Sequence, residues 1–275
     1  MEVRHALSRT PEVSPAAHGR LLSVSDGASP AVWQLAEEMP AAILLNGQNF
    51  AVMMLTPADL EDFAVGFAVT EGIVRDTAQI ESLRIGEASD GLVLNLVVDS
   101  VLAEAVEERR RTFASRSGCG VCGAQTIRAA LPKRRPVSGA VPDLTALECA
   151  YAALGPAQSM NQANRTTHAA AFCDLSGGIM LLREDIGRHN ALDKLAGALA
   201  REGRNASAGF VLLSSRVSVE MVQKAAAIGA PAIAAVSAPS ALALRSASNA
   251  GMAIFVRTAG GVMHFAAGKP GEMER

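Results

Sequence analysis

The stretch Phe210-Val211-Leu212-Leu213-Ser214-Ser215-Arg216-Val217-Ser218 decides the fold of this 275-residue chain. Its four leading apolar residues predict a buried strand. The polar residues that follow predict a turn, and Ser218 is expected to cap a helix that ends at Gly229. A strand that leads through a short turn into a helix is the repeating unit of α/β proteins.

The same order of elements repeats through the second half of the chain. Residues 232–236 predict the next strand, and Ser240 is expected to begin a helix that Gly251 closes. Further strands are predicted at 168–172, 179–182, 253–256 and 262–265, and a further helix at 184–201. This alternation predicts an α/β layer in which at least some strands are parallel.

The first half has a more mixed pattern. Apolar runs at 41–45 and 50–55 flank Asn46-Gly47, a dipeptide that favours a type I′ hairpin turn. Thr56 is expected to cap a helix that has Pro57 as its first residue. The β-branched content of residues 92–98 predicts another strand. The fold class is therefore expected to be α/β, or α+β when the whole chain is considered.

The domain organisation follows from charges, prolines and glycines. Residues 1–20 mix charges with prolines and predict a mobile tail. Prolines and a glycine between 132 and 142 predict a linker. A smaller mixed domain is therefore expected over 21–135, and the α/β layer is expected to form a second domain over 136–275.

The composition excludes several classes of protein. The 25 basic and 27 acidic residues nearly balance, at a formal net charge of −2, which disfavours binding to nucleic acid. The sequence contains neither an apolar run long enough to span a membrane nor an apolar secretory signal. Four cysteines, two of them only three positions apart, do not form a disulfide framework. These features predict a cytoplasmic protein.

The pair Cys119-Gly120-Val121-Cys122 lies between glycines, in a segment (109–135) with eight basic residues and no acidic one. Structural zinc needs a second pair of ligands, whereas Cys149 and Cys173 are isolated, so no structural metal is expected. A redox pair usually begins a helix after a strand. Sulfur carriage needs an exposed loop and cations that favour the thiolate. The sequence favours sulfur carriage and leaves the redox use open.

Residues 184–194, Glu-Asp-Ile-Gly-Arg-His-Asn-Ala-Leu-Asp-Lys, contain more polar side chains than a helix start requires. Capping explains Asp185, and solvation at the surface explains Lys194. Arg188, His189 and Asn190 together are expected to recognise a ligand.

Two predicted turns between a strand and a helix offer a second group of polar residues. Ser214, Ser215 and Arg216 follow one strand, and Ser237 follows the next. Ligands of open α/β sheets bind at the carboxyl ends of strands, and helix N-termini bind phosphate. The two turns are therefore expected to hold a diphosphate, to which Arg216 adds charge-assisted hydrogen bonds.

Five motifs together resemble the FdhD family, the accessory sulfurtransferases of formate dehydrogenase. They are CGVCG at 119–123, THAA at 167–170, EDIGRHNALDK at 184–194, SSRVSVEMVQKA at 214–225 and GMAIFVR at 251–257. The resemblance implies that Cys119 carries a persulfide and that Cys122 is its helper or a second carrier. It also implies a cytidine-deaminase-like fold for the second domain, and a homodimer.

The resemblance further implies which molecules the protein meets. Sulfur is expected to come from a cysteine desulfurase and to be delivered to Mo-bis(molybdopterin guanine dinucleotide), the cofactor of the formate dehydrogenase apo-enzyme. A guanine nucleotide is expected to bind as a partial ligand. The residues implied to line the cofactor site are Phe255, Val256, Arg257, Thr258, Ala259 and Gly260. The alternative function is that of a cofactor-binding chaperone without sulfur transfer.

Overall fold

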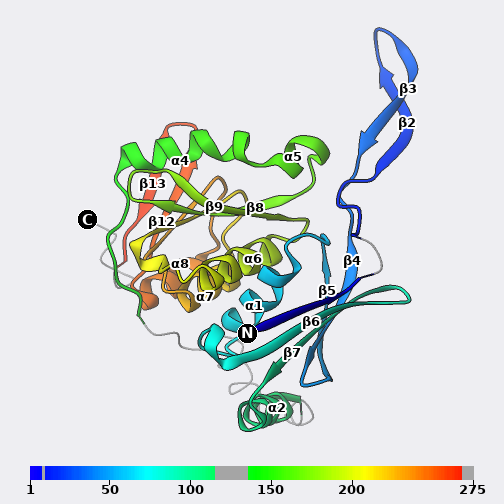
Figure 1. Ribbon diagram of the computed structural model, residues 1–275. Coiled ribbons are helices and arrows are strands. Elements are labelled where there is room, and N and C mark those ends of the chain that lie inside the picture. Colours follow the sequence, from blue (N-terminus) through cyan, green and yellow to red (C-terminus); the bar gives the residue numbers. More distant parts are fainter. Residues whose placement is uncertain (8–9, 115–135, 268–275) are drawn as a thin grey trace.

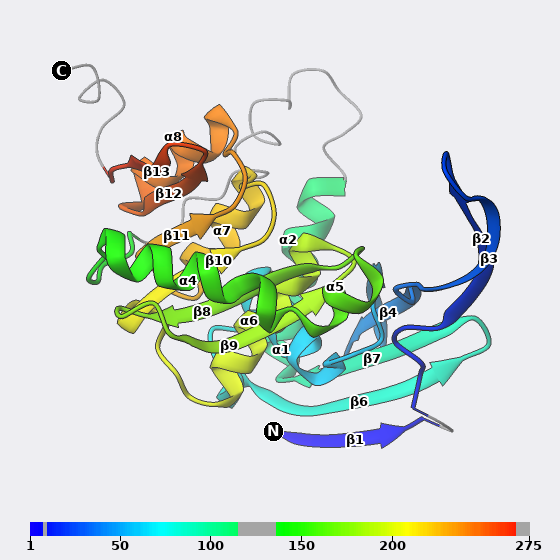
Figure 2. The same ribbon diagram turned by 90° about the horizontal axis from the view of Figure 1, so that it is seen from above.

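The computed structural model describes residues 1–7, 10–114 and 136–267, without the side chains of 109–114. These residues form two large sheets and a separate two-stranded arm of β2 (Ala16–Ser23) and β3 (Gly27–Gln34) (Figures 1 and 2). Two one-turn 3₁₀ helices, Thr77–Gln79 and Ala206–Ala208, join larger elements. No helix in the described part of the chain has the length and apolar character that a membrane crossing requires.

The C-terminal sheet has six strands in the order β13-β12-β11-β10-β8-β9. The pairings β10–β11 and β11–β12 are parallel, and the other three are antiparallel, which confirms the predicted partly parallel layer. The strands are β8 (His168–Asp174), β9 (Ile179–Asp185), β10 (Gly209–Leu213), β11 (Ala232–Ala235), β12 (Ala253–Thr258) and β13 (Gly261–Phe265).

Helices cover both faces of this sheet (Figure 1). On one face lie α6 (Arg188–Arg201), α7 (Val219–Ala227) and α8 (Ala241–Ala250), which bury Leu192, Met221 and Ala247 against alternate strand residues. On the other face lies α4 (Leu144–Ala157), followed by α5 (Ser159–Asn164). The many alanines let these layers approach closely.

Two predictions about these helices were wrong. Helix α6 begins at Arg188 and not at 184, because Glu184 and Asp185 still pair as the last residues of β9. The side chain of Ser218 makes no capping hydrogen bond, although Ser218 does precede α7. Ser240 caps α8 as predicted, since its side chain accepts a hydrogen bond from the Ala243 amide.

The N-terminal sheet has five strands in the order β1-β6-β7-β4-β5. They are β1 (Glu2–Ala6), β4 (Met39–Leu45), β5 (Gln48–Leu55), β6 (Ile80–Ala88) and β7 (Gly91–Val98), accompanied by α1 (Leu60–Thr70) and α2 (Ser100–Ala114). Asn46 and Gly47 both have positive φ, 49° and 81°, which confirms the predicted hairpin turn. Residues 1–20 differ from the predicted mobile tail, because β1 pairs with β6 along its whole length.

Helix α1 of the first half packs directly on α6 of the second through two glycines. A Cβ atom on Gly66 would collide with the carbonyl oxygen of Asp193, and a Cβ atom on Gly197 would collide with that of Asp62. Only glycine permits so close a crossing of two helix backbones. The halves of the chain are thus joined by tightly packed helices, and a domain boundary near residue 135 stays a prediction.

Candidate functional site

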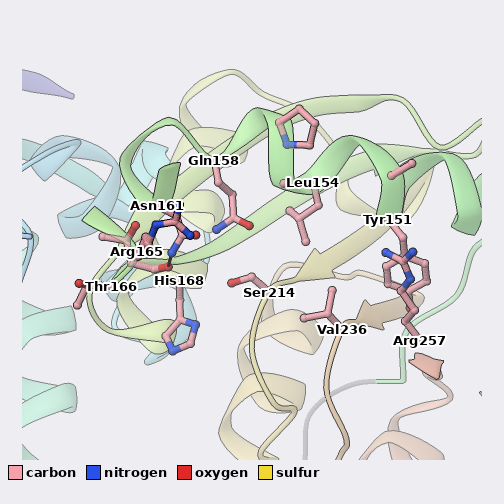
Figure 3. A pocket seen from close by; sticks show the side chains of 14 residues that line it. Tyr151, Leu154, Gln158, Asn161, Arg165, Thr166, His168, Ser214, Val236 and Arg257 are labelled. Carbon is pink, nitrogen blue, oxygen red and sulfur yellow. Dashed lines mark hydrogen bonds between the residues drawn. The ribbon is translucent and has the colours of Figure 1, made fainter. Parts of the chain in front are cut away.

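A cavity of about 620 Å³ lies between α4–α5 and the C-terminal sheet (Figure 3). Ser214 and Val236, which follow β10 and β11, line it from below, and Leu154 and Gln158 line it from above. The cavity therefore sits where two parallel strands end, which is the usual ligand position in open α/β sheets. Its volume lies in the range of small-molecule sites.

Arginines stand at opposite ends of the cavity (Figure 3). Arg257, at the end of β12, holds its guanidinium 5.8 Å from the centre of the Tyr151 ring. Arg165, which follows α5, has a left-handed backbone with φ 56°. Both side chains are exposed, so an anionic ligand in the cavity can meet a positive charge at each end.

Tyr151 fixes the helix above the cavity to the sheet below it. Its hydroxyl reaches the backbone oxygens of Ala235 (3.2 Å) and Phe255 (3.3 Å). Burial raises the pKa of Tyr151 to about 12, so the hydroxyl stays protonated and remains a donor. The ring of Tyr151 is thereby held in place under Arg257.

Glu184 fixes the other end of the cavity. Its buried carboxylate accepts hydrogen bonds from the backbone amides of Met160 and Asn161, both at 2.8 Å, and from the Thr167 hydroxyl at 3.1 Å. These bonds hold the start of α5 and the cavity-lining segment 165–168 against β9. The role of Glu184 is therefore to position the cavity wall.

His168 connects the cavity to a group of cations. Burial lowers the pKa of His168, and the nearby charges of Arg188 and Arg216 lower it further. The ring is consequently neutral at pH 7 and can accept as well as donate a hydrogen bond. An anion bound in the cavity would favour the protonated form of His168.

Arg216→Ala should raise the pKa of His168 toward its ordinary value, because the substitution removes one of two positive charges that oppose protonation. Titration of the imidazole signals by NMR measures this change. Arg75→Ala, which removes another exposed arginine, is the control and should leave the pKa of His168 where it is. An unchanged pKa in Arg216→Ala would contradict the position of Arg216 beside the cavity.

Several polar residues of the 184–194 motif bind other parts of the chain, contrary to prediction. Lys194 is fully buried and lies 2.7 Å from the Asp185 carboxylate. It also donates to the carbonyl oxygen of Thr56, at 2.9 Å. The side-chain amide of Asn190 donates to the Met54 carbonyl oxygen at 2.7 Å and to Asp185 at 3.0 Å. Lys194 is thus not a surface residue. The side-chain nitrogen of Asn190 already donates two hydrogen bonds within the protein, so it has none left to donate to a ligand.

Thr56 is part of the same network and does not cap α1. Its amide donates to Asp185 at 3.0 Å, and its hydroxyl accepts a hydrogen bond from the Ile186 amide at 3.1 Å. Helix α1 begins four residues later, after Asp59. A second buried group joins α6 to α7, where Lys224 lies 2.9 Å from Asp193. The 184–194 motif therefore connects the two halves of the molecule.

Arg188 and His189, by contrast, take no part in the hydrogen bonds described above between the two halves of the chain. They begin α6 beside the start of α7, since His189 lies 2.7 Å from the Glu220 carboxylate and 3.5 Å from the Ser218 hydroxyl. Neither helix has a side-chain cap, and the buried Nε of Arg188 has no hydrogen-bond partner among the described residues. Burial and the charge of Arg188 lower the pKa of His189, although Glu220 opposes the shift.

The predicted site residues thus fall into four groups. Ser214 and Arg257 line the cavity, while Ser237 lies one position beyond the lining residue Val236. Arg188 and Arg216 lie near the lining residue His168, and His189 lies beside Arg188 at the start of α6. The structure places Phe255 and Val256 in the core, so they do not line the cavity, and Ser215 is buried with its hydroxyl donating to the Arg216 carbonyl oxygen. Thr258, Ala259 and Gly260 are exposed at the turn before β13.

Cys119 and Cys122 lie outside the described residues. Among the residues that are described, no cluster of histidine, cysteine and acidic side chains could hold a metal ion. Cys173 is buried, and burial raises the pKa of its thiol to about 12, whereas Cys149 is exposed on α4.

Sequence reasoning missed most of the residues above the cavity. They are Tyr151, Leu154, Gln158, Asn161 and Arg165. The signal was present, because Asp143 is a good N-cap and its side chain does accept a hydrogen bond from the Ala146 amide. Apolar residues at 147, 150, 151 and 154 then recur at helical spacing.

Fold and cavity define an α/β protein with a ligand-sized cavity at the ends of its parallel strands. The model of the FdhD/NarQ family matches residues 36–267. The sulfur carrier protein FdhD of Bordetella petrii is 46% identical over 85% of this chain and 85% of its own length. That of Cupriavidus necator is 44% identical over 84% of this chain and 81% of its own length. The chain therefore belongs to the FdhD/NarQ family.

A solved structure confirms the fold. It is described as that of a formate dehydrogenase accessory protein of Desulfotalea psychrophila, and it matches with a TM-score of 0.72 over 93% of this chain and 98% of that one. The identity is 22%, so this likeness concerns the fold alone.

Proposed function

We propose that the protein is a sulfurtransferase that carries a persulfide sulfur on Cys119 from a cysteine desulfurase to Mo-bis(molybdopterin guanine dinucleotide). The observation that carries the proposal is the family: relatives at 46% and 44% identity are sulfur carriers, and this chain has a cysteine pair within its basic segment. The final recipient is the formate dehydrogenase apo-enzyme, and the transfer takes place in the cytoplasm.

The sulfur-accepting step is a thiol–persulfide exchange. The Cys119 thiolate attacks the terminal sulfur of the desulfurase persulfide, the bond between the two donor sulfurs breaks, and the desulfurase cysteine leaves as a thiolate. The basic residues of 109–135 lower the cost of forming the Cys119 thiolate. In delivery, the Cys122 thiolate can attack the inner sulfur of the Cys119 persulfide. The Cys119–Cys122 disulfide then forms, the bond to the terminal sulfur breaks, and that sulfur leaves as sulfide with the two electrons that the cysteine sulfurs give up.

The cavity is the proposed site for the guanosine diphosphate part of the cofactor substrate. Arg165 and Arg257 offer charge to the phosphates from the two ends, and the Ser214 turn lies between them. The cations around His168 extend the positive surface from the cavity toward the uncapped starts of α6 and α7. Helix N-termini favour anions, so these parts together suit a long anionic dinucleotide.

Arg257→Ala should weaken the binding of guanosine diphosphate roughly 10- to 150-fold, because a hydrogen bond to a charged group contributes about 1.5–3 kcal/mol. Arg216→Ala should have a smaller effect, since Arg216 is exposed and does not line the cavity. Isothermal titration calorimetry measures the dissociation constant of guanosine diphosphate for each variant.

The matched control for this titration is Arg245→Ala, which removes an exposed arginine from α8 and should change nothing. Equal losses in all three variants would mean diffuse charge attraction, and the absence of binding by the unaltered protein would remove the cavity from the proposal.

Activation of a formate dehydrogenase tests the function as a whole. Apo-enzyme that receives cofactor together with sulfur-loaded protein should gain formate oxidation activity, and protein treated with cyanide to remove sulfane sulfur should not activate it. Equal activation by both forms would favour the cofactor chaperone over the sulfurtransferase.

A further inference from the structure

Gln158 is a buried polar residue of the cavity wall whose side chain has no partner among the described residues. It lies where α4 meets α5 and is only 7% exposed. Its carboxamide makes no hydrogen bond within the described part of the chain. Buried polar groups are nearly always hydrogen-bonded, so this free carboxamide indicates that a ligand supplies the missing partner.

The local structure does not explain why a glutamine stands at this position. The backbone amide of Gln158 donates to the Gly155 carbonyl oxygen at 3.3 Å, and its carbonyl oxygen accepts from the Gln162 amide at 2.9 Å. Any residue with this backbone conformation makes both bonds. The Gln158 side chain does not cap α5 either, because the Glu184 carboxylate accepts hydrogen bonds from two amides of that helix.

The carboxamide of Gln158 points into the cavity. Figure 3 shows the side chain descending from the junction of α4 and α5 toward Ser214 on the opposite wall. Beside it the apolar side chains of Leu154 and Val236 reach into the cavity from the upper and the lower wall (Figure 3). Apolar groups on opposite walls with a carboxamide next to them suit a flat ring that is held by its faces and recognised at its edge.

Asn161 supplies a second polar atom of fixed identity on the same wall. Its side-chain nitrogen donates to the Thr167 carbonyl oxygen at 2.7 Å, which identifies the other atom of the amide as the oxygen. This Oδ1 has no partner among the described residues, and Asn161 lines the cavity together with Gln158. The wall therefore offers one acceptor from Asn161, and one acceptor and one donor group from Gln158.

These groups match the edge of one class of ring. Guanine and pterins share a pyrimidine ring that presents an amino donor, a ring N–H donor and a carbonyl acceptor side by side. The amino group pairs with Oδ1 of Asn161, and the ring N–H and the carbonyl pair with the two ends of the Gln158 carboxamide. Adenine has a single amino donor beside an acceptor nitrogen, so it leaves Oδ1 of Asn161 without a donor.

We propose that Gln158 and Asn161 recognise the amino-lactam edge that guanine and pterin rings share, and that they thereby determine which nucleotide the cavity accepts. The inference rests on the proposed function, because it places one ring of the cofactor substrate in the same cavity. With the ring between Leu154 and Val236, the phosphates extend toward an arginine at an end of the cavity. A site built to hydrogen-bond a polar edge rejects analogues that lack it.

Isothermal titration calorimetry of the full chain tests the role of Gln158. Gln158→Leu keeps a side chain of similar size and removes two hydrogen bonds to the ring, so it should weaken the binding of guanosine diphosphate roughly 5- to 150-fold. Inorganic pyrophosphate has no ring and should bind the variant and the unaltered protein equally. The matched control is Gln48→Leu, which replaces an exposed glutamine of β5 and should change the binding of neither ligand.

A series of ligands tests the contact of Asn161 without altering the protein. Inosine diphosphate lacks the amino group that pairs with Asn161, so it should bind the unaltered protein roughly 2- to 12-fold more weakly than guanosine diphosphate. Adenosine diphosphate should bind more weakly still. A free pterin identifies which ring of the cofactor uses the site: competition with guanosine diphosphate that Gln158→Leu weakens assigns it to the pterin as well, and lack of competition assigns it to guanine.

Two results would overturn the proposal: Gln158→Leu that binds guanosine diphosphate as tightly as Gln48→Leu does, or unaltered protein that binds adenosine diphosphate as tightly as guanosine diphosphate. Thermal unfolding should show both variants folded, because the Gln158 carboxamide makes no hydrogen bond within the described residues. Sulfur loading of Cys119, measured by mass spectrometry, should be normal in Gln158→Leu, so a failure of this inference is distinguishable from a failure of the proposed sulfur transfer.

Discussion

Replacement of Cys119 by alanine should abolish the activation of formate dehydrogenase while leaving the fold intact. The reason is chemical, because the substitution removes the thiolate on which the persulfide is proposed to form, and Cys122 alone cannot form the disulfide that releases the sulfur. The expected loss of activation is complete, whereas the arginine variants of the cavity are expected to weaken ligand binding only in part. Formate oxidation in extracts of cells that contain only the variant measures it, and thermal unfolding checks the fold.

Cys149→Ala is the matched control, since it removes a thiol that is exposed on α4 and should leave activation unchanged. Cys173 is an unsuitable sulfur acceptor, because its thiol is buried and its pKa is raised by that burial to about 12. If Cys149→Ala were as inactive as Cys119→Ala, the assignment of the carrier cysteine would be wrong.

Lys194→Ala should lower the free energy of unfolding by about 3–5 kcal/mol, because it leaves the Asp185 carboxylate buried without its counter-ion. The Thr56 carbonyl oxygen loses a donor at the same time. Urea unfolding followed by circular dichroism measures the change. The exposed Arg75→Ala is the comparison, and its effect should stay within about 0.5 kcal/mol.

A double variant separates the ion pair from general packing. Lys194→Met together with Asp185→Asn removes both charges while keeping similar volumes, and it should cost less than the sum of the two single changes. Additive costs, or a loss below about 1 kcal/mol in Lys194→Ala, would contradict the role of the pair in joining the two halves.

Local signals predicted much of the fold. Apolar runs gave β10, β11 and β12, and Asn46-Gly47 gave the β4–β5 turn, because strands and hairpins are encoded by neighbouring residues. The start of α6 was missed by four residues because Glu184 and Asp185 read equally well as the acidic first turn of a helix.

The environment of Lys194 could not be predicted from the sequence. Its partner Thr56 lies 138 positions away, and a lysine on a helix is usually solvated. Within 184–194 the sequence predicted a cap at Asp185, a solvated Lys194 and a ligand contact at Asn190, yet all three residues hold the fold together. Glu184 and Arg188 of the same motif instead lie near the cavity, and only the three-dimensional arrangement distinguishes these two groups.

The position of the cavity was predicted better than its walls. The Ser214 turn lies in it because the ends of parallel strands meet at one edge of the sheet. Phe255 was assigned to it from resemblance, but its side chain packs in the core, and its ring stacks on the exposed His264. Tyr151 and Arg165 were missed because α4, which carries Tyr151, and α5, which Arg165 follows, were not predicted.

The central claim is that Cys119 accepts a sulfur atom, and intact-protein mass spectrometry tests it most directly. The protein is incubated with a cysteine desulfurase and cysteine, and its mass is recorded before and after treatment with a reductant. The expected result is a gain of one sulfur atom that the reductant removes and that Cys119→Ala does not show. An unchanged mass in the unaltered protein, or the same gain in Cys119→Ala, would contradict the account.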